Sequence, residues 1–113
     1  MVTVADVRAL ARTLPRSSEH VIRDRVKFRV GSIVYVAFSR DETTMGFAYP
    51  KEERDALIVA DPDLFFLPGA SDLRFNWVCC HVARLDHGQM AELVTEAWRM
   101  VVPKFLARQR LGG

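Results

Sequence analysis

The chain has 113 residues, of which 50% are hydrophobic and 27% are charged, with a net charge of +2. This length predicts one domain over residues 1–113 that buries its own core without disulfides. No apolar run approaches the roughly 18 residues of a membrane helix, and the N-terminus lacks the apolar core of a secretory signal. We therefore expect a cytoplasmic protein that does not enter a membrane.

The first predicted element is a helix from about Thr3 to Thr13. Thr3 can cap it, because Asp6 follows three residues later in the capping-box arrangement. Its apolar side chains recur at helical spacing and form one stripe: Val4, Val7, Leu10, Ala11 and Leu14. Pro15 ends the helix.

The next segment alternates basic and apolar residues. The cations take every second position: Arg23, Arg25, Lys27 and Arg29. The positions between them are apolar except for Asp24: Ile22, Val26, Phe28 and Val30. A period of two predicts a β-strand with one core face and one row of cations.

Two further strands follow through short turns. The pair Gly31-Ser32 predicts a tight turn into a strand over Ile33–Ser39, since glycine accepts the backbone angles of hairpin turns. The segment Arg40–Glu42 predicts a second turn, into a strand over Thr43–Tyr49. Together these three strands predict an antiparallel meander.

The second half of the chain predicts two helices around one strand. Pro50 is suited to a helix start, and the helix should run to about Ala60. A strand is expected within Arg74–Leu85. The capping-box pair Asp86 and Gln89 precedes an apolar stripe that predicts the last helix, which Pro103 should interrupt. The order predicts an α+β fold, in which an antiparallel sheet packs against the N- and C-terminal helices.

The sequence offers no strong catalytic or metal-binding pattern. His20, His81 and His87 lack the spacing of a metal site. Cys79 and Cys80 are interpreted as reduced packing thiols, and Cys80 and His81 should face opposite sides of a strand.

Glu52 and Glu53 are best explained as acids at a helix N-terminus. We therefore predict no catalytic residues, no metal and no cofactor, and expect a protein that is not an enzyme.

The row of cations from Arg23 to Arg29 is either the solvent-exposed face of a half-buried sheet or a surface that binds an anionic ligand. Arg8 and Arg12, with Arg16, extend the row if the first helix packs nearby. Arginine is suited to phosphate because its planar guanidinium donates two parallel hydrogen bonds. Phe28 belongs to the opposite face, so the sequence does not predict base stacking beside the cations.

The order of several short segments resembles the MmcQ/YjbR family of small bacterial proteins. The matching segments span nearly the whole chain: Leu14-Pro15, Val26–Gly31, Glu53–Leu57, Trp77-Val78, Glu96–Arg99 and Pro103-Lys104. The resemblance implies an α+β fold sometimes called double-wing and a DNA-binding role. It implies no catalytic residues and no cofactor. Ser32 stands where such proteins often carry a basic residue after the hairpin glycine.

These observations lead to one functional hypothesis and two alternatives. We expect DNA binding through phosphates by the cations on the strand and first helix: Arg23, Arg25, Lys27, Arg29, Arg8 and Arg12. The first alternative is an interaction module whose basic face meets an acidic surface, such as the acidic stretch 40–63 of a second copy. The second is a small-ligand pocket lined by Trp77, Phe65, Phe66 and Trp98. The sequence leaves the oligomeric state open.

Overall fold

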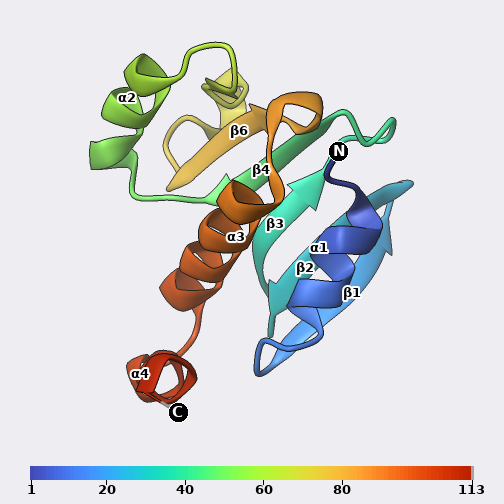
Figure 1. The fold of residues 1–113 in the computed structure, drawn as a ribbon, viewed down its shortest axis with the longest axis vertical. Coiled ribbons are helices and arrows are strands. Elements are labelled where there is room, and N and C mark those ends of the chain that lie inside the picture. Colours follow the sequence, from blue (N-terminus) through green and yellow to red (C-terminus); the bar gives the residue numbers. More distant parts are fainter. Residues whose placement is uncertain (113) are drawn as a thin grey trace.

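The computed structural model describes the backbone of residues 1–112 and the side chains of residues 1–108. It contains one six-stranded sheet, in which every neighbouring pair is antiparallel and the strand order is β1-β2-β3-β4-β6-β5 (Figure 1). The strands are β1 (Ser17–Ile22), β2 (Arg25–Val30), β3 (Ile33–Phe38), β4 (Thr44–Ala48), β5 (Phe65–Phe66) and β6 (Trp77–His81). The helices are α1 (Val4–Ala11), α2 (Lys51–Ala60), α3 (His87–Val101) and α4 (Lys104–Gly112), with short 3₁₀ turns η1 (Ala70–Asp72) and η2 (Val82–Arg84).

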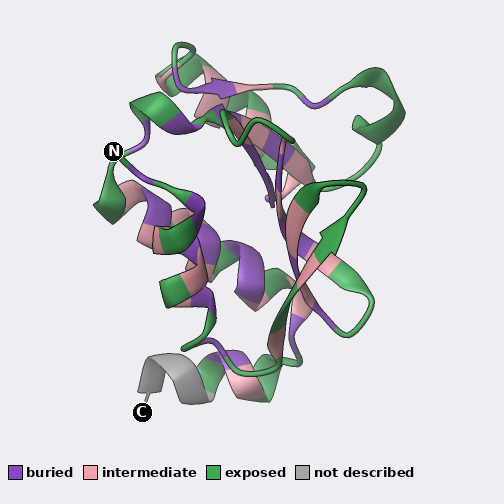
Figure 2. Ribbon diagram, turned by 90° about the vertical axis from the view of Figure 1, so that its right-hand side faces the viewer, coloured by how far each residue is buried: buried purple, intermediate pink, exposed green. Residues whose placement is uncertain are grey.

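Helices α1 and α3 lie side by side on one face of the sheet, which confirms the predicted α+β arrangement (Figure 1). Buried residues fill the space between these helices and the strands (Figure 2). The largest of them is Trp98 of α3, which is fully buried and donates from its indole N–H to the Pro15 carbonyl at 2.8 Å. We call this side of the sheet the helix face and the opposite side of β2, β3, β4 and β6 the open face.

The helix termini follow the sequence signals. Both predicted capping boxes are present, Thr3 with Asp6 at α1 and Asp86 with Gln89 at α3. Pro103 separates α3 from α4, as expected of a residue that cannot donate a backbone hydrogen bond. None of the helices in the described part of the chain has the length and apolar character needed to cross a bilayer.

The sheet differs from the prediction at its first edge. The strand expected from Ile22 to Val30 is two strands, β1 and β2, joined by a turn at Arg23 and Asp24 with φ angles of 53° and 66°. Consecutive positive φ angles are those of a type I′ hairpin turn, usually made by Asn and Gly. The prediction of a strand at Arg23 was therefore wrong, and Ile22 pairs with Arg25 across the hairpin. The residues of β1 are mostly polar because it is an edge strand with little burial, so they gave no alternation to detect.

The late strand is shorter than predicted. Only Trp77–His81 of the expected Arg74–Leu85 segment is extended, and it pairs with β4 on one side and with the two-residue β5 on the other. The segment 67–76 before it forms a loop that contains η1. This loop proves to be one wall of the candidate site.

Candidate functional site

Strand β2 presents three of the four predicted cations on the open face. Arg25, Lys27 and Arg29 alternate with Phe28 and Val30, which are buried on the helix face. Phe28 is only 1% exposed, so the predicted two-sided strand is confirmed from Arg25 onward. Arg23 belongs to the preceding turn.

Arg29 is tied to the neighbouring edge strand. Its Nη2 donates to Nδ1 of His20 at 3.3 Å, and Nε2 of His20 lies 2.9 Å from Oγ of Ser18. Its Nε is buried and has no hydrogen-bond partner among the described residues. The guanidinium of Arg29 is thus partly buried and hydrogen-bonded to His20, so it is less available to a ligand than Arg25 and Lys27.

Arg25 and Lys27 have more freedom. Arg25 uses Nε for a 3.3 Å hydrogen bond to the Phe38 carbonyl, which leaves its terminal nitrogens for another acceptor. Within residues 1–108, no ion pair involves Arg25, Lys27 or Arg29. None of these three cations is therefore in direct contact with a carboxylate of the described chain.

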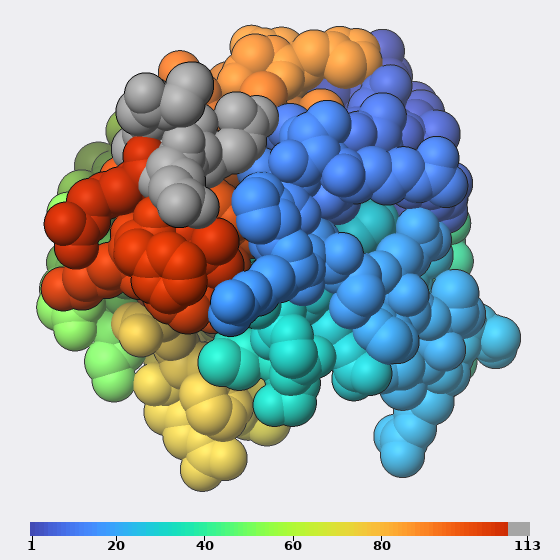
Figure 3. All heavy atoms as spheres, turned by 90° about the horizontal axis from the view of Figure 1, so that it is seen from below, coloured from blue at the N-terminus to red at the C-terminus, as the bar shows by residue number. Residues whose placement is uncertain are grey.

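Both Arg25 and Lys27 line a hollow of about 440 Å³. Seen from below in Figure 3, it opens between the 67–76 loop in yellow and the β1–β2 hairpin in light blue, with β3 in cyan between them. Its remaining lining residues are mostly apolar or aromatic: Ile33, Val34, Ala37, Ala48, Asp72, Phe75, Asn76, Trp77, Met100 and Val101. The hollow thus combines two cations and one carboxylate, that of Asp72, with a largely apolar surface.

The aromatic wall of this hollow comes from Phe75 and Trp77, far from β2 in sequence. Trp77 lies against the backbone of β4 at Gly46, where a Cβ atom would stand 2.4 Å from the indole nitrogen. Only glycine permits this close approach, and an isolated glycine within a strand is the sequence signal that could have indicated it. The signal does not say which side chain approaches, so sequence reasoning missed this wall.

Helix α2 holds the same wall in place. The guanidinium of Arg54 donates to three backbone carbonyls, those of Leu73 at 2.8 Å, Phe75 at 3.1 Å and Trp77 at 3.3 Å. The backbone N–H of Lys51 donates to Oδ1 of Asn76 at 3.0 Å. Arg54 is therefore a positioning residue, and sequence reasoning had assigned it no role.

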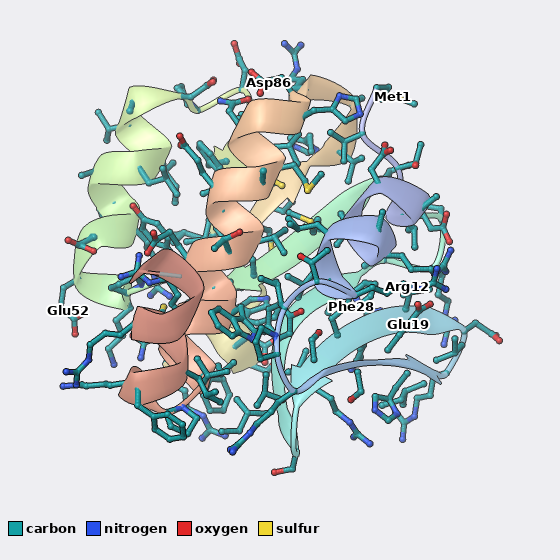
Figure 4. All side chains as sticks on the ribbon, turned by 60° about the horizontal axis from the view of Figure 1, so that its bottom comes forward. Met1, Arg12, Glu19, Phe28, Glu52 and Asp86 are labelled. Atoms are coloured by element: carbon teal, nitrogen blue, oxygen red, sulfur yellow. The ribbon has the colours of Figure 1, made fainter. Side chains whose placement is uncertain are left out.

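Arg8 and Arg12 do not join this surface. Nε and Nη2 of Arg8 donate to the two carboxylate oxygens of Glu19 at 2.7 and 2.8 Å, on the helix face of β1. The hydrogen bonds and charge of Arg8 hold the pKa of Glu19 below its ordinary value, with Arg12 adding a smaller effect. Figure 4 shows Arg12, Glu19 and Phe28 together beneath α1. The expected extension of the cation row by the first helix is therefore wrong.

Arg23 contributes to the open side from a different position. It lines a second hollow of about 470 Å³ with Arg25, Ser39, Arg40 and Asp41. Nε of Arg40 donates to the Arg23 carbonyl at 3.2 Å, which links the β1–β2 and β3–β4 turns. Arg23 and Arg40 thus continue the positive charge of Arg25 along the rim of the sheet.

The predicted aromatic pocket is not formed. Trp98 and Phe65 are buried in the core on the helix face, whereas Trp77 lines the hollow. Phe66 stacks on His81 at a ring distance of 4.5 Å. Of the four aromatic residues proposed for the pocket, only Trp77 borders the hollow.

The thiols are packed as predicted. Burial raises the pKa of Cys79 to about 11 and that of Cys80 to about 12, so both are protonated at neutral pH. Cys80 is buried and pairs with Met45, whereas the next residue, His81, is exposed on the opposite face. The described residues contain no cluster of three or more groups suited to a metal ion.

Comparison with known proteins gives a family and a related fold. The model of the YjbR family matches residues 12–100. The chain belongs to the YjbR family. Its fold is similar to the crystal structure of Deinococcus radiodurans protein DR2400, which contains the DUF419 domain, with a TM-score of 0.78 and 22% identity over 99% of this chain and 89% of that one. No curated protein matches this YjbR-family chain.

Proposed function

We propose that this YjbR-family protein binds DNA through phosphate contacts on the open face, and that its role is binding and not catalysis. The observation that carries the proposal is the placement of Arg25 and Lys27 in one hollow without an ion-pair partner among the described residues. Arg23 and Arg40 add positive charge beside them. A row of cations along an exposed sheet surface matches the spaced negative charge of a nucleic acid backbone.

The contrast with the paired cations supports the same assignment. Arg8 and Arg99 each contact a carboxylate of the same chain, at 2.7 and 2.6 Å. Since exposed like charges on neighbouring positions repel one another, an unpaired row costs stability unless an anion meets it. Arg25 and Lys27 differ from the other cations without an ion pair because both line one hollow, where a single external anion can contact them together.

The test is the salt dependence of DNA affinity, measured by fluorescence anisotropy with labelled duplex and single-stranded DNA. For the parent protein, log affinity should fall linearly with log salt concentration, because each neutralised phosphate releases condensed counterions. The double variant Arg25→Ala/Lys27→Ala should bind more weakly to unrelated sequences alike and should flatten the slope by about 1.5 to 2 units. Its stability should stay within about 0.5 kcal/mol of the parent.

A control variant of equal charge separates the site from net charge. Arg12→Ala/Arg84→Ala also removes two cations, and neither residue lines either hollow. It should leave the salt slope unchanged. Absence of DNA binding by the parent at about 50 mM salt, or equal losses in the two double variants, would contradict the proposal. An acidic protein as the true partner predicts the first of these results.

A further inference from the structure

We infer that the hollow accepts an unpaired nucleobase, so that the protein prefers single-stranded DNA to a perfect duplex. This inference rests on the proposed DNA binding and names the form of DNA that the site takes. It is argued from the aromatic wall, the position of the cations and Asn76, a neutral polar residue of the hollow whose amide can contact a base edge.

The aromatic wall is the first argument. Phe75 is 50% exposed at the hollow, although a large aromatic side chain gains from burial. The guanidinium of Arg74 lies over its ring, 4.8 Å from the centroid, and covers one of the two ring faces. The indole of Trp77 is backed by Gly46, and Arg54 fixes the backbone of both residues. A partly exposed aromatic surface on a fixed backbone suits base stacking, because every base has a flat apolar face.

The cations are the second argument. Arg25 and Lys27 border the same hollow from β2, opposite the aromatic wall. A nucleotide presents a flat base and a phosphate within one residue, so the two kinds of surface can be used together. The volume of about 440 Å³ falls within the range typical of small-ligand pockets.

Asn76 is the third argument. Its Oδ1 accepts from the Lys51 backbone N–H, so the NH₂ group of this lining residue keeps its donors for a ligand. A base carbonyl is a suitable acceptor for this donor. In a duplex, base faces are covered by their neighbours, so only an unpaired base can meet the wall and Asn76 together.

The experiment compares three DNA probes of equal length. These are an oligothymidylate, a strand with abasic sites in place of every base, and a duplex. The oligothymidylate should quench the fluorescence of Trp77 and bind about tenfold more tightly than the abasic strand. Trp98 is fully buried and should not respond, and the variant Trp77→Phe assigns the quenching.

Matched aromatic variants test the wall. Phe75→Ala should remove most of the tenfold preference and leave the affinity for the abasic strand unchanged. Phe105→Ala is the control, because Phe105 is 54% exposed, similar to Phe75, but does not line the hollow. It should leave the preference unchanged.

The outcomes separate this inference from the proposed function. Equal affinity for the oligothymidylate and the abasic strand, without quenching, would overturn the inference and leave phosphate binding intact. Tighter binding of the duplex would also overturn it. Saturable quenching by free thymidine monophosphate at the same concentrations would identify a free nucleotide as the ligand instead of a strand. Failure to bind any of the three probes would refute the proposed function itself.

Discussion

Basic and aromatic side chains occur on both faces of the sheet, but they differ in whether they are paired or buried. On the helix face, Arg8 is held by both oxygens of Glu19, and the aromatic rings of Phe28 and Trp98 are buried. On the open face, Arg25 and Lys27 have no such partner in the described chain, and Phe75 is half exposed. Residue type alone therefore does not separate structural from ligand-binding side chains. The difference lies in whether the fold supplies a partner.

The largest expected effect is on the helix face. Trp98→Ala should lower the free energy of unfolding by about 3–5 kcal/mol, because it leaves a large cavity and an unused acceptor at the Pro15 carbonyl. Urea denaturation measures this loss. A loss below about 1 kcal/mol would show that Trp98 does not anchor α3 in the core.

A medium effect is expected where the open face is packed most closely. Gly46→Ala places a methyl group 2.4 Å from the Trp77 indole nitrogen, so the ring must move. Overpacking of this kind costs about 1–3 kcal/mol, and the displaced ring should also weaken binding of the oligothymidylate. Chemical denaturation and the Trp77 emission spectrum check both effects.

Gly69→Ala is the matched control for this substitution. A Cβ atom at Gly69 meets nothing within 4 Å, and the residue has no positive φ angle. The free energy of unfolding of the Gly69→Ala variant should equal that of the parent or exceed it slightly, because alanine lowers the conformational entropy of the unfolded chain. If Gly46→Ala behaves like Gly69→Ala, Trp77 is not fixed against β4 as described.

The smallest effect is expected for the ion pair on the helix face. Arg8 lowers the pKa of Glu19, so the carboxylate is favoured in the folded state. The resulting stability is present above the ordinary pKa near 4.5 and is lost as the pH falls through the lower folded value. Glu19→Gln should therefore destabilise the protein by less than about 1 kcal/mol at pH 7. Thermal unfolding across pH should show this difference vanishing in acid, and a difference that grows in acid would contradict the assignment.

The local sequence predicted the elements whose signals are local. The capping boxes of α1 and α3 and the break at Pro103 depend on residues within one or two helical turns. The two-sided character of β2 also follows from its own alternation. The turn at Arg23 and Asp24 was missed because Arg23 is atypical of a type I′ turn and Asp24 stands at the second central position, where glycine is favoured. The residues of the polar edge strand β1 also show no alternation of polar and apolar side chains.

The composition of the site could not be predicted in the same way. The sequence placed cations on one side of β2 and found no aromatic residue among them, which argued against base stacking. The structure brings Phe75 and Trp77 to the same hollow from a segment some fifty residues later. Strand β4 pairs with β3 on one side and with β6 on the other. This pairing places Trp77 of β6 only two strands from Ala37 of β3, so both residues line the same hollow.

By itself the sequence determined the α+β class, the helix caps and the cations of β2, because hydrophobic periodicity and capping act between near neighbours. Only the tertiary structure decided which cations find an acid and which aromatic rings stay exposed. Those outcomes depend on strand order and on side chains that approach across the sheet, such as Trp77 over Gly46. The pairing of strands that are distant in the chain produces no periodic pattern in the local sequence. The residues that line the site can therefore be identified only from the assembled sheet.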